Sequence, residues 1–298
     1  MKVRFAVTPP ASALTEDCFG NYLSACEQLK FDTIWLSDIP LGTMGDPVIA
    51  LSYAAAATTK LNLGANIVPL GRNPMWLAKQ LAQIDRLSGG RVLLSFVPGL
   101  GSQGERDALG YGDSNRGAAI DDIVDLMRRW WAGERISAAM EGYSFSDVVV
   151  HPRPLQSPLE IWLGGKAPAA LRRVARLADG WLTSAATPDE AGAGKIQIER
   201  LAGEFGRIVD AEHFGISIPV TLGEPDEQAL QSLRSRREDG DLSQIVAIGP
   251  KGLRALLDRH LDQGLSKFVL RPLNAMETQA DWRRDLDWIA ETALPLQT

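Results

Sequence analysis

The sequence predicts an α/β barrel of the (βα)8 type, with an insertion between the fourth helix and the fifth strand. Short apolar runs alternate with helical patterns along the chain, and the first four runs start about thirty residues apart, which is the size of one βα unit. The runs are nearly continuous in apolar residues, as expected for parallel strands covered on both faces. The eight predicted strands begin at Lys2, Asp32, Leu61, Arg91, Leu159, Asp179, Phe214 and Ser266.

The segments between these runs have the period of amphipathic helices. Leu77, Leu81 and Ile84 share one helical face, and the stripe of Leu171, Val174, Ala175 and Ala178 follows the fifth strand. The pair Trp130-Trp131 closes another such helix and is expected to pack in the core rather than to stack on a ligand. A weaker run at 244–248 is left out of the eight strands. Because we find no boundary, we expect residues 1–298 to form a single domain.

Residues 133–158 break this rhythm. They have no helical period and are too long for a tight connection, so we expect a small hairpin or insertion there. The charged run at 234–239 is expected to be a solvated helix end and loop, because mixed charge runs are usually exposed.

Composition excludes several classes of function. The net charge is −6 and the isoelectric point is near 5.2, which makes nucleic acid a poor partner. The apolar run at the start breaks at Pro9-Pro10, short of a signal peptide and of the roughly 20 residues of a membrane span. We therefore expect a cytoplasmic protein without a membrane partner.

The cysteines and histidines predict neither a disulfide nor a zinc site. Cys18 and Cys26 are eight residues apart, or about 12 Å on a helix, which exceeds the reach of a disulfide. The three histidines are scattered, so we expect no metal, although an all-carboxylate site stays open.

A glycine-rich segment follows the fourth strand. Gly99-Leu100-Gly101-Ser102-Gln103-Gly104 has the letters of a dinucleotide-binding motif, but it does not follow the first strand, and the next convincing helix is expected only near Gly117. We therefore expect a flexible loop at the barrel mouth that leaves room for a flat ligand.

A second glycine pair lies between the fifth strand and the next helix. Gly164-Gly165 precedes Lys166 and Ala167, and Pro168 is placed to open a helix. Such a turn presents backbone N–H groups at the positive end of a helix, which suits a phosphate-sized anion. A tight turn that needs glycine only for its geometry is the alternative.

Polar residues end three strands, where the chemistry of a barrel normally lies. Asp38 ends strand two and is either a functional carboxylate or a cap. Asn66 ends strand three, where Gly64 suggests a bulge. Arg271 ends strand eight and either binds an anionic substrate or pairs with a carboxylate. Since no nucleophile motif is present, we expect a cofactor to carry the chemistry.

Five segments together resemble the luciferase-like monooxygenase superfamily, in particular its probable F420-dependent oxidoreductase branch. The segments are Leu29 to Asp38 (LKFDTIWLSD), Leu63 to Asn66 (LGAN), Arg72 to Arg91, which ends in DRLSGGR, Ile161 to Gly165 (IWLGG), and Leu177 to Trp181 (LADGW). This resemblance runs through nearly the whole chain.

The resemblance implies a barrel that binds F420, or alternatively FMN, at the carboxyl ends of the strands. The ring would lie near Asp38, Asn66, Ile67 and Gly99, with a non-prolyl cis peptide at Asn66-Ile67. The cofactor phosphate would lie on the turn of Gly164, Gly165, Lys166 and Ala167. It also implies a homodimer through the second and third helices, for which the exposed side of residues 54–57 is small and flat.

Two departures from the family pattern accompany it. Ile39 follows Asp38 where many F420 enzymes have histidine, and Leu100 matches the position of a glutamate acid in the sugar-phosphate dehydrogenases. We therefore predict an F420-dependent oxidoreductase with Asp38 and Asn66 as catalytic residues and an unidentified small-molecule substrate. The alternatives are an FMN-dependent monooxygenase and a barrel that binds a flavin or metabolite without turnover.

Overall fold

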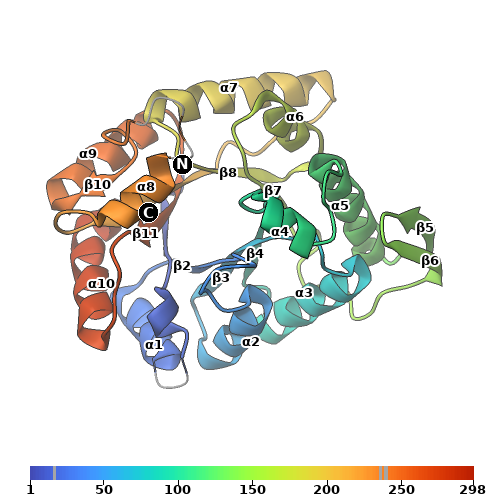
Figure 1. The fold of residues 1–298 in the computed structure, drawn as a ribbon, viewed down its shortest axis with the longest axis horizontal. Coiled ribbons are helices and arrows are strands. Elements are labelled where there is room, and N and C mark those ends of the chain that lie inside the picture. The colour runs from blue at the N-terminus through green and yellow to red at the C-terminus, as the bar shows by residue number, and fades with distance from the viewer. Residues whose placement is uncertain (16–17, 235–236, 238–240) are drawn as a thin grey trace.

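The computed structural model describes residues 1–15, 18–234, 237 and 241–298, and it is a barrel of parallel strands surrounded by helices (Figure 1). The barrel strands are β1 (Arg4–Val7), β2 (Thr33–Ser37), β3 (Asn62–Ile67), β4 (Val92–Phe96), β7 (Ile161–Leu163), β8 (Gly180–Ser184), β9 (Phe214–Thr221) and β11 (Lys267–Pro272). The helices are α1 (Phe19–Leu29), α2 (Pro47–Ala57), α3 (Pro74–Ser88), α4 (Gln103–Ala108), α5 (Arg116–Ala132), α6 (Pro168–Leu177), α7 (Pro188–Glu204), α8 (Glu227–Arg234), α9 (Gly249–Asp262) and α10 (Gln279–Ala293). Two 3-10 turns lie at Ala11–Ala13 and Leu294–Leu296.

The strand order confirms the predicted barrel. The sheet runs β9-β11-β1-β2-β3-β4-β7-β8, and the pairing of β8 with β9 closes it. The weaker run at 244–248, which we left out, contains a two-residue strand, β10 (Ala247–Ile248), that pairs with β9 outside the eight barrel strands. A run this short carries too few residues for periodicity to reveal it.

Strand register decides which side chains enter the barrel. Trp35 lies opposite Gly64, and Asn66 lies opposite both Ser37 and Ser95. Because alternate residues of a strand point to the same face, Ser37, Asn66 and Ser95 form a polar layer at the carboxyl end. Toward the amino end the interior is apolar, with a cluster that includes Trp35, Trp162 and Leu182.

The DRLSGGR segment has a structural role. The buried Asp85 carboxylate accepts hydrogen bonds from the backbone N–H of Leu155, at 2.6 Å, and of Gln156, at 2.9 Å. The Arg91 guanidinium donates to backbone oxygens that include those of Leu61, at 2.6 Å, and Thr58, at 3.0 Å. These side chains fasten the connections at the amino end of the barrel, away from its mouth.

The insertion is a two-stranded antiparallel hairpin of β5 (Ile136–Met140) and β6 (Tyr143–Val148). Trp130 packs edge-on against Phe145 and is fully buried, and the indole N–H of Trp131 donates to the carbonyl of Ala78 at 3.0 Å. Both the predicted hairpin and the packing role of this tryptophan pair are confirmed. Cys18 and Cys26 are free thiols, and Cys26 is buried in α1.

Two expectations about the mouth were wrong. The peptide bond Asn66-Ile67 is trans, because the cis bonds of the described chain are His151-Pro152 and Ser157-Pro158. Asn66 and Ile67 continue the regular ladder with β4, and Gly64 marks no bulge: a Cβ there would lie 2.2 Å from the Trp35 ring. The helix expected near Gly117 is present as α5, which begins at Arg116, but the short helix α4, capped by Ser102, precedes it.

Candidate functional site

The barrel mouth contains a cavity of about 560 Å³ at the ends of β1, β2 and β11. Ser37, Ile39 and Arg271 line it, together with Asp226 and Gln228 at the start of α8. Thr8, at the end of β1, also lines it, and its buried hydroxyl has no hydrogen-bond partner within the described residues. This mixture of polar and apolar groups suits a small organic molecule.

The carboxylate of Asp38 is turned away from this cavity. Its Oδ2 accepts hydrogen bonds from the backbone N–H of Val68, at 3.0 Å, and from the Arg72 guanidinium, at 2.9 Å. Burial raises the pKa of Asp38, and the charge of Arg72 opposes that shift. Arg72 also pairs with Asp46, which caps α2. Asp38 therefore acts here as the cap of a turn and holds the loop after β3.

Asn66 and Ile67 lie at the end of β3. Asn66 belongs to the polar layer with Ser37 and Ser95, and Ile67 is the next residue along the strand. Asn66 is half-buried and Ile67 is fully buried. Ser95, which faces Asn66 across the register, has a buried hydroxyl without a partner in the part of the chain that the structure describes. Unsatisfied buried hydroxyls are uncommon, so the Ser95 hydroxyl is a polar group that the barrel interior leaves unused.

Gly99 shapes the glycine-rich loop around Glu105. Its φ is +79°, and a Cβ would lie 2.3 Å from the Glu105 carboxylate. That buried carboxylate accepts from the backbone N–H of Gly101 at 3.1 Å. The loop is therefore closed by its own helix, and the dinucleotide interpretation finds no support in its geometry.

A second cavity, of about 340 Å³, lies between the ends of β4 and β7 and the start of α5. Gly164 and Gly165 line one side of it, and Arg116 and Arg173 line the other. Arg116 donates to the carbonyl of Pro98 at 2.9 Å, and no carboxylate of the described residues pairs with it. Arg173 pairs with Asp121 at 2.6 Å, and Asp121 also pairs with Arg176.

Neither arginine was predicted from the sequence. Gly101 and Gly117 make room for them, because a Cβ would lie 2.8 Å from the Arg116 guanidinium and 2.1 Å from that of Arg173. One signal was present: Arg116 opens a helix, where the helix dipole disfavours a cation. A cation at the amino end of a helix is favourable when an anion binds beside it.

A hydrogen bond from Trp181 on β8 holds the Gly164-Gly165 turn. The Trp181 indole N–H donates to the Gly165 carbonyl at 2.8 Å, and Gly165 has a φ of +98° that only glycine adopts readily. Helix α6 starts at Pro168 as predicted, and its N-cap, Ala167, offers no side-chain hydrogen bond. Pro168 has no N–H and the Ala170 N–H donates to the Ala167 carbonyl at 2.8 Å, so the N–H of Ala169 is the group at this end that has no partner within the helix.

Lys166 and Ala167 face a third cavity, of about 720 Å³, between α6 and α7. The Lys166 ammonium donates to the Ala185 carbonyl at 3.1 Å and lies 3.9 Å from Glu190. Glu190 also pairs with Arg237, so two cations share one carboxylate. The structure thus divides the predicted phosphate site into an arginine side and a lysine side.

No group of three or more His, Cys, Asp or Glu side chains among the described residues is arranged to hold a metal ion. The helices of the described chain include none that is long and apolar enough to span a membrane.

An α/β barrel with cavities at the carboxyl ends of its strands is an architecture in which enzymes place their active sites. The model of the luciferase-like monooxygenase family matches residues 12–287, and the chain belongs to this family. Family members are oxidoreductases and monooxygenases.

Three comparisons illustrate the range of the family. The chain is 29% identical over 186 residues to an FMNH2-dependent dimethylsulfone monooxygenase of Pseudomonas putida, and the match covers 61% of this chain and 50% of that protein. A monooxygenase of Streptomyces bottropensis has the same fold, with a TM-score of 0.79 and 22% identity over 98% of this chain and 99% of that one. An F420-dependent secondary alcohol dehydrogenase matches with a TM-score of 0.81 and 17% identity over all of both chains. The similar proteins therefore include users of both cofactors.

Proposed function

We propose that this protein is an F420-dependent oxidoreductase that transfers a hydride between C5 of the deazaflavin and an organic substrate. The observation that carries the proposal is the pair of cavities on either side of the Gly164-Gly165 turn. One side offers Arg116 and Arg173 to a phosphate, and the other offers Lys166 in a hollow of about 720 Å³. F420 carries an acidic tail beyond its phosphate, whereas FMN ends at the phosphate.

The residues present fit such a cofactor. The Ala169 N–H at the start of α6 and the guanidinium of Arg116, which no carboxylate of the described residues pairs with, suit a phosphate. Asn66, Ile67 and Gly99 remain the proposed neighbours of the ring, and Asn66 would hold its polar edge. The bound cofactor would supply the hydride chemistry, and the protein would orient it and exclude water.

The substrate would enter the cavity of about 560 Å³ at the mouth. We assign Arg271 there to an anionic or strongly polar group of the substrate. Asp38 would act through position, since its bonds to Val68 and Arg72 hold the loop that follows Asn66 on β3.

An FMN-dependent monooxygenase is the second candidate. The dimethylsulfone monooxygenase that the chain resembles is named for FMNH2, and the arginine side of the turn by itself accommodates a cofactor that ends in a phosphate. In this alternative the cavity around Lys166 has no role in cofactor binding.

Titration of the purified protein with F420 and with FMN, followed by the fluorescence of each cofactor, tests the proposal. We expect F420 to bind more tightly, Gly165→Asp to abolish the binding of both cofactors, and Arg116→Gln to weaken both by about tenfold. Lys166→Gln should weaken F420 alone, and the exposed Lys251→Gln is the matched control.

Each outcome separates the candidates. Tight binding of FMN with no preference for F420 would establish the monooxygenase alternative. If neither cofactor binds, the barrel is better explained as a metabolite-binding protein without turnover. An unchanged F420 affinity in Lys166→Gln would remove the assignment of the tail to the lysine side.

A further inference from the structure

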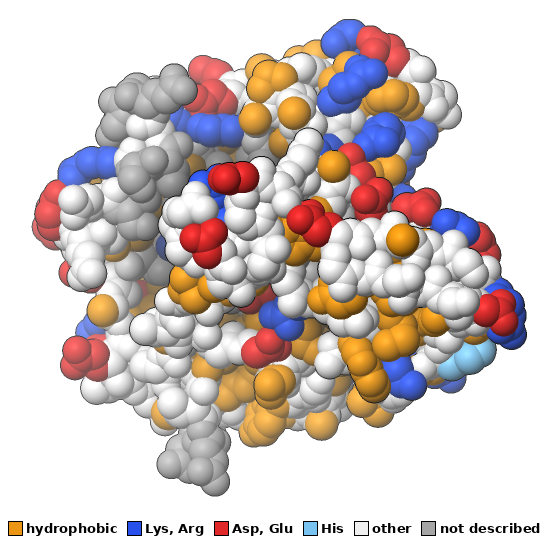
Figure 2. Space-filling model, turned by 45° about the vertical axis from the view of Figure 1, so that its right-hand side comes forward, with side chains coloured by type: hydrophobic (Ala, Val, Ile, Leu, Met, Phe, Trp, Pro, Cys, Tyr) orange, Lys and Arg blue, Asp and Glu red, His pale blue; other side chains and the backbone are white. Residues whose placement is uncertain are grey.

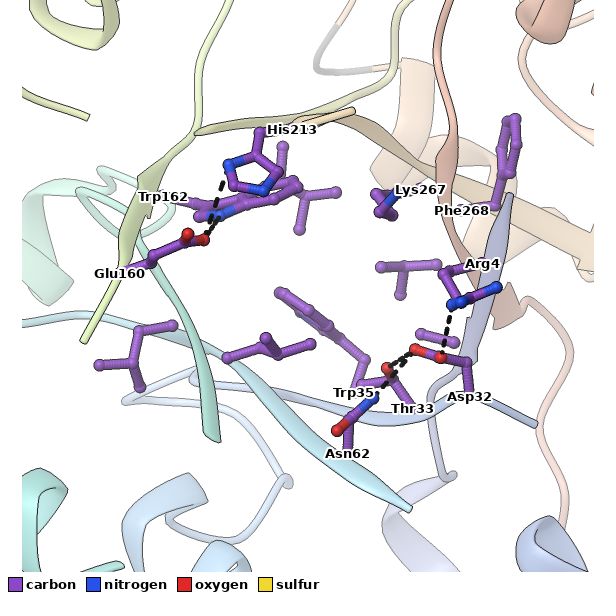
Figure 3. Close-up of a pocket in the computed structure, with 15 residues that line it drawn as sticks. Arg4, Asp32, Thr33, Trp35, Asn62, Glu160, Trp162, His213, Lys267 and Phe268 are labelled. Atoms are coloured by element: carbon purple, nitrogen blue, oxygen red, sulfur yellow. Dashed lines mark hydrogen bonds and ion pairs between the residues drawn. The ribbon is translucent and has the colours of Figure 1, made fainter. Parts of the chain in front are cut away.

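A cavity of about 230 Å³ opens at the amino end of the barrel, opposite the mouth (Figure 3). The ends of barrels at this pole normally serve stability, and their interiors are filled by layers of branched side chains. Here the labelled side chains surround an open centre, with Glu160 and His213 on one side and Arg4, Asp32 and Asn62 on the other (Figure 3).

Two tryptophans are folded flat against the barrel wall, and this leaves the centre open. Trp35 lies opposite Gly64 in the register, and Trp162 lies opposite Gly180. A Cβ would approach the Trp35 ring to 2.2 Å at Gly64 and the Trp162 ring to 2.4 Å at Gly180. The same pairing of indole and glycine therefore occurs twice, and it gives the cavity two aromatic walls.

The remaining wall is apolar, and the second indole is held in place. Ala6, Leu93, Leu182 and Val269 complete the lining. The Trp162 N–H donates to Glu160 at 3.2 Å, and the His213 ring lies 5.3 Å from the Trp162 ring. His213 is anchored in turn by a hydrogen bond of 3.0 Å to the Asp179 carbonyl.

Trp35 retains an unused hydrogen-bond donor. The residue is 94% buried, and its indole N–H has no partner among the described residues. Buried donors are normally satisfied by protein or water, so this one is available to a ligand.

At the rim, the Lys267 ammonium is not held in a direct ion pair, and the carboxylates of Glu212 and Asp32 act on it only from a longer distance. The Asp32 carboxylate is satisfied by Arg4, at 3.0 Å, and by Thr33, at 2.6 Å, and Glu160 by Trp162. The Lys267 ammonium instead donates to neutral groups, the Lys2 carbonyl at 2.7 Å and the Ser266 hydroxyl at 3.1 Å. Within the described chain no carboxylate lies within ion-pairing distance of it, so Lys267 can pair with an incoming anion.

We propose that this cavity is a second binding site, distinct from the cofactor site, for a small aromatic monocarboxylate. The ring would lie between the indoles of Trp35 and Trp162, and the carboxylate would face Lys267. An apolar cavity of about 150 Å³ is sufficient to bind benzene, so a volume of about 230 Å³ matches one ring with a short acidic side chain. No covalent step is involved.

Calorimetric titration with phenylacetate, benzyl alcohol and benzylamine tests this site. We expect phenylacetate to bind, benzyl alcohol to bind more weakly, and benzylamine not to bind, because Lys267 repels it. Lys267→Met should weaken phenylacetate by tenfold or more and leave benzyl alcohol unchanged, since only the charge contact is lost. Equal binding of phenylacetate and benzylamine, or of phenylacetate to both proteins, contradicts the proposed contact.

The position of the site is tested by filling it. Ala6→Leu adds bulk to the cavity and should abolish phenylacetate binding, whereas Arg271→Met, at the mouth, should not change it. If circular dichroism shows that Ala6→Leu does not fold, Leu93→Phe is the replacement variant, because it fills the same cavity from β4. Binding that survives in the folded filling variant, or that Arg271→Met abolishes, overturns the proposal.

Discussion

The indole N–H of Trp181 on β8 donates a hydrogen bond of 2.8 Å to the carbonyl oxygen of Gly165 in the turn before α6. The Trp181 ring is almost fully buried and packs against α7, where a Cβ at Gly194 would lie 2.7 Å from it. The Gly164-Gly165 turn is therefore attached to the barrel wall by a buried residue, which also lines the cavity around Lys166.

Trp181→Phe removes this hydrogen bond and keeps most of the packing. We expect a loss of about 1–2 kcal/mol in the free energy of unfolding and a five- to tenfold weaker cofactor affinity, since the turn loses its support. Trp288→Phe is the control, because its N–H donates to Asp285 on α10, away from the turn. Equal cofactor affinity in the two variants would contradict the role given to Trp181.

Asp38→Asn tests the capping role of that carboxylate. The Asp38 side chain is only 6% exposed and shares Arg72 with Asp46, so its loss leaves Arg72 paired with the more exposed Asp46 alone. We expect about 2 kcal/mol of destabilisation in urea unfolding, less than for a fully buried pair because Arg72 is a quarter exposed. Asp46→Asn, at a more exposed carboxylate, should cost less. If Asp38→Asn has the same free energy of unfolding as the native protein, the Asp38 carboxylate does not stabilise the loop, and the capping role is wrong.

The homodimer that the family resemblance implies remains a prediction. The structure points to a different set of interface residues from the one expected from the sequence. Ala54 and Ala55 are buried, so the small flat face expected over residues 54–57 is only partly available. Instead Ile49, Trp76 and Leu87, which are 73%, 54% and 63% exposed, surround a groove between α2 and α3. Figure 2 shows hydrophobic side chains gathered on the lower part of the molecule, where these helices lie.

Trp76→Glu should convert a dimer to a monomer in sedimentation velocity at micromolar concentration. A charge buried without a partner at the centre of an interface is costly, whereas the same change at the exposed Ile208 should have no effect. A native protein that sediments as a monomer would remove the interface altogether.

His260 predicts a loss of stability in acid. The residue is fully buried, and burial, with a smaller contribution from Arg259, lowers the pKa of its imidazole to about 4. Above about pH 6.5 the imidazole is neutral in both states, so it adds no pH dependence. Between about pH 6.5 and 4 the unfolded chain binds a proton that the folded chain does not, and stability falls by about 3 kcal/mol.

Urea unfolding at pH 7.5 and pH 4.5 measures this effect. His260→Leu should lose most of the pH dependence and keep its stability at pH 7.5, because neither ring nitrogen has a partner within the described residues. The exposed His151→Gln should behave like the native protein. If His260→Leu loses as much stability between pH 7.5 and pH 4.5 as the native protein does, other groups cause the loss.

Much of the barrel could be predicted because its signals are local. Each βα unit carries its own apolar strand and helical stripe, so the eight strands, the hairpin near residues 136–148 and the helix starting at Pro168 follow from short windows of sequence. β10 and α4 were missed because two and six residues give too little periodicity.

The site was harder to predict because its residues come from distant segments. Gly164 and Gly165 were identified from their own turn, but Arg116 and Arg173 meet them only through the packing of α5 and α6 against β4 and β7. Asp38 was identified by its position at a strand end, but the direction of its carboxylate depends on Arg72, thirty-four residues later.

The sequence by itself determined the architecture, because apolar strands and amphipathic helices alternate along the whole chain, most regularly in the first four units of about thirty residues. It also determined the glycine-rich turns, since glycine adopts positive φ angles such as those of Gly99 and Gly165 more readily than other residues do. Only the tertiary structure decided which charges share a cavity, which carboxylate is consumed by an internal ion pair, and where tryptophans folded against glycines leave space. Those features depend on strand register and helix packing, which bring together side chains that no local pattern relates.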